Sequence, residues 1–485
     1  MANKRAILLI GGLDPQGCAG ITADIQTATM LGCHAVPLLT CLTQQTREGL
    51  TDLGALSETQ FMAQYQSCVA DVDIAAIKIG LIPNADIAQC ISNIIDQHDV
   101  PVVLDPVLAS TSGGLSVDND VKHIILQSLL PKITLLTPNL PELAKLVNEV
   151  ELDVPQLELA TESLLKKGLT ACLVTGGHAD SPWAADYFTD GKNSFYCYHK
   201  KQANNVRGTG CVLATSLASQ LALGQDIRDA TVLAKAYINQ GVRQSNVVGP
   251  YRVFHQSMAK LVFEDIPKLC YDVKLIGKQF NFQPCPDRLG IYPVVDSSDW
   301  VGKLVKEGIK TIQLRIKTGS EQVKRQHIIQ AASNCDDAVA FFVNDHWKMA
   351  IENQVYGVHL GQEDLHDANL IEIEQAGLRL GISTHSYWEL ARALAINPSY
   401  IALGPVFETS SKQMPFEPQG IARVAQWAEM LAGHYPLVAI GGIDLLRAKA
   451  LKKTGVGAVA MISAITKADD YQKAIRDLIV CWQSG

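Results

Sequence analysis

In the last two hundred residues, short apolar runs alternate with segments of helical length and pattern, such as 320–333 and 418–433. The eight runs begin near Leu289, Thr311, Val339, Gly357, Leu378, Tyr400, Leu437 and Gly457. Eight successive strand–helix units predict a (β/α)8 TIM barrel, whose active site lies at the carboxyl ends of its strands. Polar or glycine residues suited to phosphate or metal follow these runs, so this half is predicted to be an enzyme.

The first half of the chain also alternates strands with helices, but its spacing and motifs differ. Near-continuous apolar runs, typical of parallel strands covered on both faces, occupy 6–11, 35–40, 74–79, 101–104, 133–136 and 171–175. We therefore expect an α/β domain over 1–262 and the barrel over 288–485. Between them, 263–287 contains three prolines and mixed charges without periodicity, which indicates a linker.

Composition agrees with a cytoplasmic catalyst of two domains. A chain of 485 residues is too long for one ordinary core, and 47% hydrophobic with 19% charged residues is typical of a packed globular protein. The net charge of −8 argues against nucleic acid as a partner. No signal sequence or membrane span is predicted, and the twelve scattered cysteines are expected to be reduced thiols. The sequence leaves homo-oligomer formation open.

The second strand of the predicted barrel ends in Gln313-x-Arg315-x-Lys317. Strand geometry places alternate residues on one face, so an amide, a guanidinium and an ammonium converge at the barrel mouth. This set suits a multiply charged oxyanion. The alternative is an exposed edge strand with solvated charges, which fits less well beside a barrel core because burying such charges without an anion is costly.

Further groups at the strand ends suggest two anionic sites. Asn344-Asp345 and Asp364 follow neighbouring strands, and two carboxylates suit Mg²⁺ shared with substrate phosphates; each aspartate alone could instead cap a helix. Hydroxyls and an ammonium occur together in 409–412, and Gly441-Gly442 with Ile462-Ser463 follow strands seven and eight, the usual phosphate pocket of such barrels. A metal diphosphate and a monophosphate are the expected ligands.

These motifs, together with His359-Leu-Gly-Gln-Glu-Asp364, Gly381-Ile-Ser-Thr-His385 and Gly404-Pro-Val-Phe407, resemble thiamine phosphate synthase. The likeness covers essentially all of 288–480, and its one visible departure is Ser411 where the family usually has threonine. The resemblance implies that hydroxymethylpyrimidine diphosphate is joined to a thiazole phosphate, with release of diphosphate. It assigns diphosphate binding to Gln313, Arg315, Lys317 and Asn344, and Mg²⁺ binding to Asp345 and Asp364. It assigns the thiazole phosphate to Thr409, Ser411, Gly442, Ile462 and Ser463. Lys412 and Ser383 would face the departing diphosphate and the pyrimidine.

That reaction suits the residues. If the bond to diphosphate breaks early, an electron-rich pyrimidine carries the developing positive charge. The protein then chiefly stabilises the leaving group with a metal ion and fixed cations. The thiazole nitrogen attacks from a position set by its phosphate, and no general base is required. The absence of an obvious catalytic histidine fits this scheme.

In the first half, Gly208-Thr209-Gly210-Cys211 precedes an apolar helical run. Backbone N–H groups at a glycine-rich helix start form an anion hole, and Cys211 there is expected to have a lowered pKa and to activate a hydroxymethyl group. A plain tight turn is the alternative for this motif alone. Asp105 and Glu142 follow other strands and are candidates for holding Mg²⁺, although Glu142 equally suits a helix first turn.

With 14–20, 23–24 and 78–80, these segments resemble hydroxymethylpyrimidine and phosphomethylpyrimidine kinase of the ribokinase-like fold, over about 5–262. The resemblance places the pyrimidine at Gly12 and Gln45, the reacting phosphate at Cys211 with Gly208, Thr209 and Gly210, and Mg-ATP near Asp105, Asn139 and Glu142. Family lysines are Thr111 and Thr175 here, a Gln-Asn-Thr segment is Gln45-Thr46-Arg47, and a histidine is Arg207. Losing two ammonium groups near nucleotide phosphates weakens the expected transition-state stabilisation.

The chain is thus predicted to be a bifunctional enzyme of thiamine biosynthesis, in which a pyrimidine kinase feeds a thiamine phosphate synthase. The implied co-substrate is ATP, and the partners are small molecules. Two alternatives concern the first half: a degenerate kinase fold that no longer transfers phosphate, or a pyridoxal-type kinase. Thr111 and Thr175 favour the degenerate fold, whereas Cys211 and Asp105 oppose it.

Overall fold

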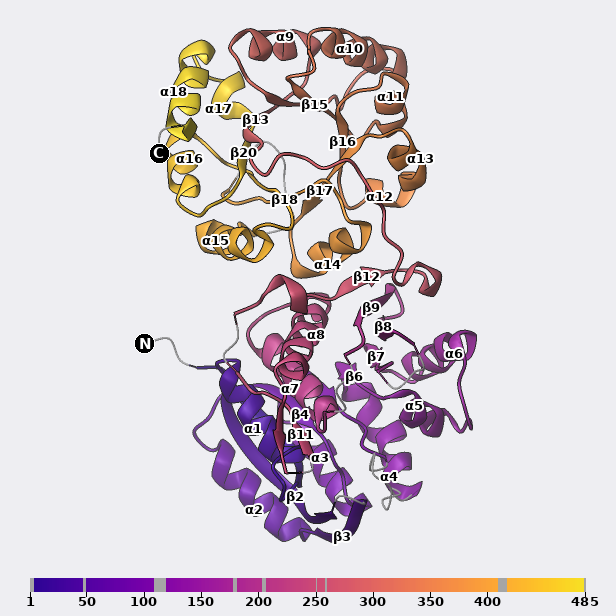
Figure 1. Ribbon diagram of the computed structural model, residues 1–485. Helices are drawn as coiled ribbons and strands as arrows, with labels where there is room; N and C mark the ends of the chain where they lie inside the picture. The colour runs from indigo at the N-terminus through magenta and orange to yellow at the C-terminus, as the bar shows by residue number, and fades with distance from the viewer. Residues whose placement is uncertain are drawn as a thin grey trace. The chain divides into compact units, whose positions relative to one another are not determined.

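The computed structural model describes residues 4–46, 49–108, 119–177, 181–202, 206–249, 251–257, 260–408 and 417–483. The chain forms two compact units, Met1–Gly277 and Lys278–Gly485 (Figure 1). Within the described residues, no helix is both long and apolar enough to cross a membrane.

A ten-stranded sheet is the centre of the first unit, in the order β12-β9-β8-β7-β6-β5-β4-β1-β2-β3. The strands are β1 (Ala6–Leu13), β2 (His34–Thr46), β3 (Gly49–Ala55), β4 (Ile74–Ile79), β5 (Val102–Leu104), β6 (Leu135–Leu136), β7 (Cys172–Val174), β8 (Trp183–Thr189), β9 (Ser194–Lys200) and β12 (Lys268–Cys270). The six neighbours from β7 to β2 in this order are mutually parallel, as the six apolar runs predicted. Antiparallel β3 and β8–β9–β12 extend the two sides.

Helices cover both faces of this sheet. They are α1 (Gly20–Met30), α2 (Glu58–Val69), α3 (Ala85–Ile95), α4 (Asn119–Ile124), the π-helix η1 (Ile125–Leu129), the 3₁₀-helix η2 (Leu130–Lys132), α5 (Leu140–Val147), α6 (Val154–Leu165), α7 (Thr209–Ala222) and α8 (Ile227–Arg243). The strand order reverses direction after β2, so that right-handed crossovers are expected to put α1 on one face and the connections from α2 to α6 on the other. Helix α7 packs on α1 and α8. With helices on both faces of the sheet, the unit has the expected three-layer αβα architecture.

Part of the expected linker, 263–287, belongs to the fold of the first unit. Strand β12 pairs with β9 and so completes the first sheet at that edge, with the 3₁₀-helices η3 (Phe263–Asp265) and η4 (Val273–Leu275) on either side. The strand was not predicted because it begins with charged Lys268 directly after Pro267, so no continuous apolar run marks it. A separate hairpin, β10 (Asn246–Val248) with β11 (Tyr251–Val253), follows α8.

The second unit is a closed barrel of eight parallel strands, in agreement with the eight predicted runs. The strands are β13 (Gly290–Val295), β14 (Thr311–Leu314), β15 (Ala340–Asn344), β16 (Gly357–Leu360), β17 (Arg379–Thr384), β18 (Tyr400–Leu403), β19 (Leu437–Ile440) and β20 (Ala458–Met461). The helices are α9 (Ser298–Lys306), α10 (Glu321–Ser333), α11 (Trp347–Glu352), α12 (Asp364–Asp367), α13 (Leu370–Gln375), α14 (Tyr387–Ile396), α15 (Gly420–Leu431), α16 (Leu445–Lys452), α17 (Ser463–Thr466) and α18 (Tyr471–Gln483).

The amino-terminal end of the barrel is tied to the segment just before β13. The backbone carbonyls of Phe280, Gln283 and Pro284 accept hydrogen bonds from Asn397 Nδ2, Ser399 Oγ and Arg379 Nε, respectively. Cys285 packs against the aromatic core of the barrel, which includes Tyr292, Phe342 and Tyr400. We call 278–287 the floor segment.

Candidate active sites

In the second unit, the predicted diphosphate residues lie at the carboxyl end of β14 and β15. Gln313 is buried within β14, Arg315 is half-buried just after the strand, and Lys317 is exposed. Asn344 is the last residue of β15 and is buried. Since parallel strands in a barrel end on one side, these side chains share the mouth of the barrel.

The two predicted metal ligands lie against each other. Asp345 follows β15 and Asp364 begins α12, and burial together with the Asp364 carboxylate raises the pKa of Asp345 to about 6. Arg315 and Lys317 act in the opposite direction on the same group, so all four side chains belong to one cluster. Asp345 has a φ of +63°, a conformation that aspartate and asparagine tolerate better than most residues.

On the other side of the mouth, Gly442 follows β19 with a φ of +64°. A Cβ atom here would lie 2.4 Å from the carbonyl oxygen of Glu408, so the close approach of the two loops requires glycine. Ile462 follows β20, and Ser463 begins the four-residue helix α17. The predicted residues Thr409, Ser411 and Lys412 lie outside the described residues.

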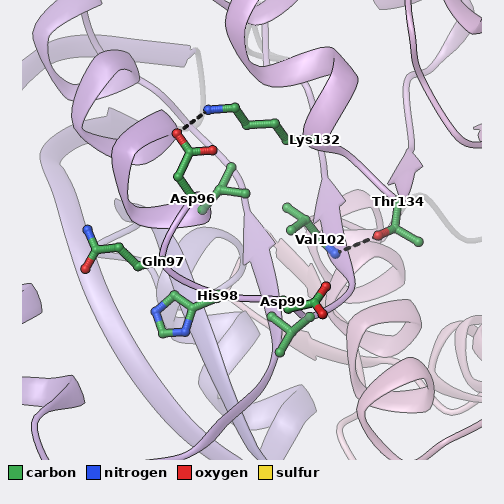
Figure 2. A pocket seen from close by; sticks show the side chains of 9 residues that line it. Asp96, Gln97, His98, Asp99, Val102, Lys132 and Thr134 are labelled. Atoms are coloured by element: carbon green, nitrogen blue, oxygen red, sulfur yellow. Dashed lines mark hydrogen bonds and ion pairs between the residues drawn. The ribbon is translucent and has the colours of Figure 1, made fainter.

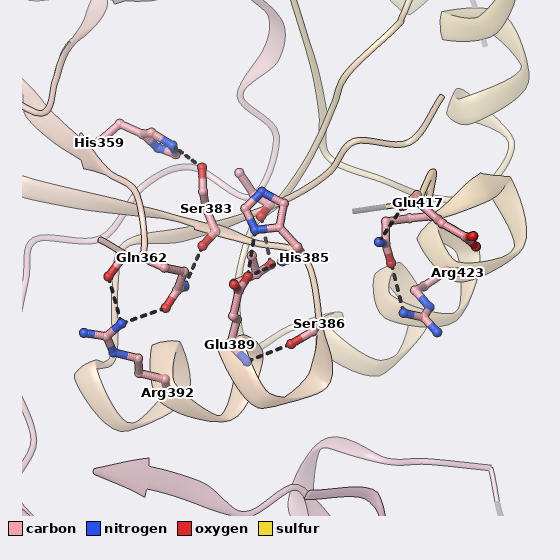
Figure 3. A network of polar contacts seen from close by, with 12 residues as sticks. His359, Gln362, Ser383, His385, Ser386, Glu389, Arg392, Glu417 and Arg423 are labelled. Atoms are coloured by element: carbon pink, nitrogen blue, oxygen red, sulfur yellow. Dashed lines mark hydrogen bonds and ion pairs between the residues drawn. The ribbon is translucent and has the colours of Figure 1, made fainter. Parts of the chain in front are cut away.

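Ser383 lies near the end of β17 and is held by two neighbours from β16 and the loop after it (Figure 3). His359 Nε2 is 2.8 Å from Ser383 Oγ, and Gln362 Nε2 donates to the Ser383 carbonyl at 2.7 Å. Arg392 in turn donates to the Gln362 carbonyl at 2.8 Å. Burial, aided by Arg315, lowers the pKa of His359 to about 4, so its ring is neutral at physiological pH.

His359 was not among the predicted site residues, although its motif was noted. It lies in the middle of an apolar strand, where a buried histidine gives no periodic signal. Its contacts come from Tyr400 and Ser383, which are distant in sequence. Only the closed barrel brings them together.

In the first unit, Gly208 is the N-cap of α7 and has a φ of +80°. A Cβ atom at this position would lie 1.9 Å from the Cys18 carbonyl oxygen, so the helix start packs directly on the 14–19 loop. Thr209, Gly210 and Cys211 form the first turn of α7. The predicted anion hole therefore has the required element, a helix N-terminus with exposed Gly210.

The expected lowered pKa of Cys211 is wrong. Burial, together with the carboxylates of Asp105 and Asp24, raises its pKa to about 12 despite the nearby Lys78 ammonium. The helix N-terminus does not prevail because the thiol faces acidic neighbours in a dry setting. Cys211 is thus a thiol at neutral pH, and its S–H donates a hydrogen bond to Asp105.

Beneath this helix start lies a fully buried ion pair that the sequence did not reveal. Lys78 Nζ is 2.7 Å from Asp24 Oδ2, with both side chains 0% exposed, and Thr215 donates to Asp24 Oδ1 at 2.7 Å. Burial lowers the pKa of Lys78, but Asp24, Cys211 and Asp105 outweigh it and raise the pKa above its usual value. Lys78 therefore stays protonated near Cys211, with its charge balanced by Asp24.

The carboxylate of Glu142 has the helix-capping role that was the alternative to metal binding. Its Oε2 accepts from Asn139 N at 2.9 Å, while Asn139 Oδ1 accepts from Glu142 N at 2.9 Å, a reciprocal capping box at the start of α5. Burial and neighbouring Asp105 nevertheless raise the pKa of Glu142 to about 8. Asp105 follows β5 and is itself buried, near enough for its charge to act on Glu142.

The remaining predicted positions of the first unit lie around the carboxyl ends of the same strands. Gly12 is in β1, where a Cβ atom would lie 2.7 Å from Cys41 Sγ, and Gln45 is near the end of β2. Arg207 NH1 donates to Gln16 Oε1 at 3.0 Å, and its guanidinium lies 5.4 Å from the centre of the Tyr251 ring. Thr175 follows β7, whereas Thr111 lies outside the described residues.

A surface hollow lies at the opposite end of this sheet. It is lined by residues of 95–102 with Lys132 and Thr134, at the amino ends of β5 and β6, and has a volume of about 570 Å³ (Figure 2). In open α/β sheets, ligands bind outside the carboxyl ends of the strands, where the predicted residues lie. The hollow is therefore separate from the candidate site.

Two α/β folds with polar clusters at the carboxyl ends of parallel strands define the class of protein as a two-unit enzyme. The model of the thiamine monophosphate synthase family matches residues 291–465, and that of the phosphomethylpyrimidine kinase family matches 14–254. The thiamine-phosphate synthase of Pectobacterium atrosepticum is 52% identical over 199 residues, which are 41% of this chain and 93% of that protein. That of Salmonella typhimurium is 52% identical over 202 residues, 41% of this chain and 95% of that protein.

The pyridoxal kinase of Staphylococcus aureus in complex with AMP-PCP is 21% identical, with a TM-score of 0.51 over 56% of this chain and 99% of that one. This likeness shows the ribokinase-like fold of the first unit. The chain belongs to the thiamine-phosphate synthase family, and it joins that synthase to a phosphomethylpyrimidine kinase domain. It is therefore an enzyme of thiamine biosynthesis, as predicted, with ATP as the co-substrate of its kinase domain.

Proposed function

We propose that the second unit couples hydroxymethylpyrimidine diphosphate to a thiazole phosphate at the mouth of the barrel. The observation that carries this assignment is the cluster of Arg315 and Lys317 with the contacting carboxylates Asp345 and Asp364. Two carboxylates in contact repel each other once ionised, and a divalent cation removes that repulsion. The pair fits Mg²⁺, which would neutralise part of the charge on the diphosphate.

The protein's own residues then perform the rest of the chemistry. Gln313, Arg315, Lys317 and Asn344 hold the diphosphate, and the two cations offset the negative charge that grows on it as its bond to the pyrimidine carbon breaks. The backbone at Gly442 and Ser463, with Ile462, holds the thiazole phosphate, so the ring nitrogen is fixed close to the carbon that it attacks. We extend the phosphate site to Thr409 and Ser411, and the diphosphate site to Lys412.

For the first unit, we propose that hydroxymethylpyrimidine and its monophosphate are phosphorylated from ATP at the start of α7. Gly208, Thr209 and Gly210 would receive the reacting phosphate, Gly12 and Gln45 the pyrimidine, and Asn139 the nucleotide. Asp105 and Glu142 would hold Mg²⁺. Their raised pKa values support this assignment, because burial of both acids, and for Glu142 the charge of Asp105, disfavours ionisation that a divalent cation would compensate.

The role of Cys211 changes with its raised pKa. As a thiol hydrogen-bonded to Asp105, it is not a ready base. We propose that, when Mg²⁺ engages the Asp105 carboxylate, the Cys211 S–H is released from it and donates to the transferring phosphate, with buried Lys78 nearby. We place the boundary between the two activities at Gly277, the end of the first compact unit.

The experiment that tests both halves measures ADP formation by the full chain with hydroxymethylpyrimidine, its monophosphate or pyridoxal, and thiamine phosphate formation in parallel. We expect ADP with both pyrimidines and none with pyridoxal. ADP with pyridoxal alone would establish a pyridoxal-type kinase, and no ADP at saturating Mg-ATP would establish a degenerate fold. Cys211→Ala is expected to remove most kinase activity without affecting the synthase; an unchanged kinase rate would contradict its role.

A further inference from the structure

A continuous row of hydrogen bonds crosses the interior of the barrel from β14 to β17. Gln313 Nε2 lies 3.3 Å from Tyr292 Oη, which lies 2.8 Å from Tyr400 Oη. Tyr400 Oη is 2.7 Å from His359 Nδ1, and His359 Nε2 is 2.8 Å from Ser383 Oγ. The first four residues are buried, and Ser383 opens toward the mouth. The row thus links a predicted diphosphate residue to the predicted pyrimidine residue.

The direction of donation along this row follows from proton counting once the Gln313 amide presents Nε2 to Tyr292. A tyrosine hydroxyl has one proton to give, and a neutral imidazole carries one N–H. Because the Gln313 amide donates to Tyr292, Tyr292 gives its own proton to Tyr400, and Tyr400 gives its proton to His359 Nδ1. His359 must then carry its hydrogen on Nε2 and donate it to Ser383.

The opposite direction is inconsistent with that first hydrogen bond. Tyr292 would accept from both Gln313 and Tyr400, and its own O–H would be buried without an acceptor among the described residues. An unpaired buried polar group loses its bond to water and gains nothing in return, so this arrangement is disfavoured. Only a turned Gln313 amide, with its oxygen toward Tyr292, would satisfy every member in reverse.

We propose that this row makes Ser383 a hydrogen-bond donor to the substrate, with Tyr292, Tyr400 and His359 as positioning residues. Since Ser383 Oγ accepts from His359, its own hydrogen remains for a ligand. This proposal rests on the proposed function only for the identity of the ligand that Ser383 binds. A pyrimidine diphosphate offers acceptors at its ring nitrogens and diphosphate oxygens, whereas its amino group is a donor and would not match.

The backbone around Ser383 is held independently of this row. Gln362 bonds the Ser383 carbonyl, and Arg392 bonds Gln362, as Figure 3 shows. A change at His359 should therefore alter the polarity and position of the hydroxyl while leaving the strand end in place.

The first test reads the tautomer of His359 directly in the full chain. Nitrogen-15 NMR of histidine-labelled protein distinguishes a protonated ring nitrogen from a bare one, and His359→Gln identifies the signal. We expect a protonated Nε2 and a bare Nδ1 at pH 7. The reverse tautomer would overturn the proposal. This measurement needs no turnover, so its failure is distinct from failure of the proposed reaction.

The second test compares two amide replacements of His359 in steady-state coupling. A glutamine amide can place an N–H where Nε2 donates, whereas the shorter asparagine replaces only Nδ1. We expect His359→Gln to keep the KM for the pyrimidine diphosphate within about fivefold and His359→Asn to raise it at least about tenfold. The KM for thiazole phosphate should change in neither. Equal losses in both variants, or a further loss when His359→Asn is added to Ser383→Ala, would overturn the proposal.

Discussion

The barrel and the first unit both handle phosphate esters, but they keep their charges in different places. The barrel holds Arg315 half-buried and Lys317 exposed at strand ends, in the proposed diphosphate site. The first unit instead buries its cation, Lys78, in contact with Asp24, and its proposed phosphate site consists of backbone N–H groups at the start of α7. A cation at the mouth serves binding and catalysis, whereas a buried cation also becomes part of the folding free energy. Substitution of these charges should therefore lower the catalytic rate in the barrel and the stability in the first unit.

The largest effect is expected in the barrel mouth. Arg315→Ala and Asp345→Asn should each lower the rate of coupling by about 10²–10³-fold or more, because they remove charge matched to the departing diphosphate and its metal. Asparagine suits the φ of +63° at position 345, so the backbone is not strained. Thiamine phosphate formation checks this, with Arg325→Ala as the matched control, because Arg325 on α10 is half-buried like Arg315 and pairs with Glu352 away from the strand ends. Near-normal coupling in either variant would remove that residue from the site.

In the first unit, the largest expected effect is on stability. Lys78→Met leaves the Asp24 carboxylate buried and unpaired, which should cost roughly 3–5 kcal/mol, while the barrel unfolds as before. Denaturant unfolding monitored separately for the two units measures this. Lys132→Met is the control, because the Asp96 carboxylate that pairs with half-buried Lys132 is exposed to water, and such a pair is worth about 1 kcal/mol or less. Equal effects of the two substitutions would show that burial of the pair contributes nothing.

A pH dependence sharpens the comparison at the paired carboxylates of the barrel. The pKa of Asp345 is raised to about 6 in the folded protein, above the value of roughly 4 in an unfolded chain. Its protonation therefore supports the fold fully below about pH 4, and this support is lost as the pH rises through about 6. Millimolar Mg²⁺ should replace the proton, so its thermal stabilisation should grow between about pH 5 and 7.5. Asp345→Asn should abolish that growth.

The smallest expected effect tests whether the first unit lacks a cation at the carboxyl ends of its strands. Thr175→Lys adds an ammonium at the carboxyl end of β7, beside Asn139, and should tighten ATP binding by about fivefold, which is about 1 kcal/mol. Calorimetric titration with a non-hydrolysable ATP analogue measures this. Thr170→Lys, just before β7 at the amino end of the sheet, is the control and should change nothing. No gain at position 175 would indicate that Arg207 or another group already supplies the charge.

Local pattern predicted the parallel strands of both units, because each is a continuous apolar run long enough to recognise. It missed β3, β8, β9 and β12, which extend the first sheet antiparallel and are short or mixed in polarity. In the sites, residues at strand ends were predictable from their type and position. Lys78, Asp24 and the His359–Tyr400–Tyr292 row were not, since their roles depend on partners far away in the sequence. The separations are 54 residues for Lys78 with Asp24 and 108 for Tyr292 with Tyr400.

The pKa of Cys211 shows a different limit. A helix N-terminus alone lowers a thiol pKa, and that much can be predicted from Gly208-Thr209-Gly210-Cys211. The opposing influences are burial and the carboxylate of Asp105, which comes from the end of β5, far earlier in the chain. The sign of such a shift is settled by tertiary neighbours and not by the motif.

Nearly all of the segment between the two catalytic units takes part in the fold of one unit or the other. Strand β12 closes an edge of the first sheet, and from Phe280 onward the floor segment is bonded to the barrel. The stretch between them contains η4, and the first compact unit extends to Gly277, where any side chain would meet the Trp183 ring. A synthase excised at Arg288 would lose its floor, whereas one cut at Lys278 would keep it. The positions at which the chain can be divided without loss of structure from either unit are therefore confined to a few residues.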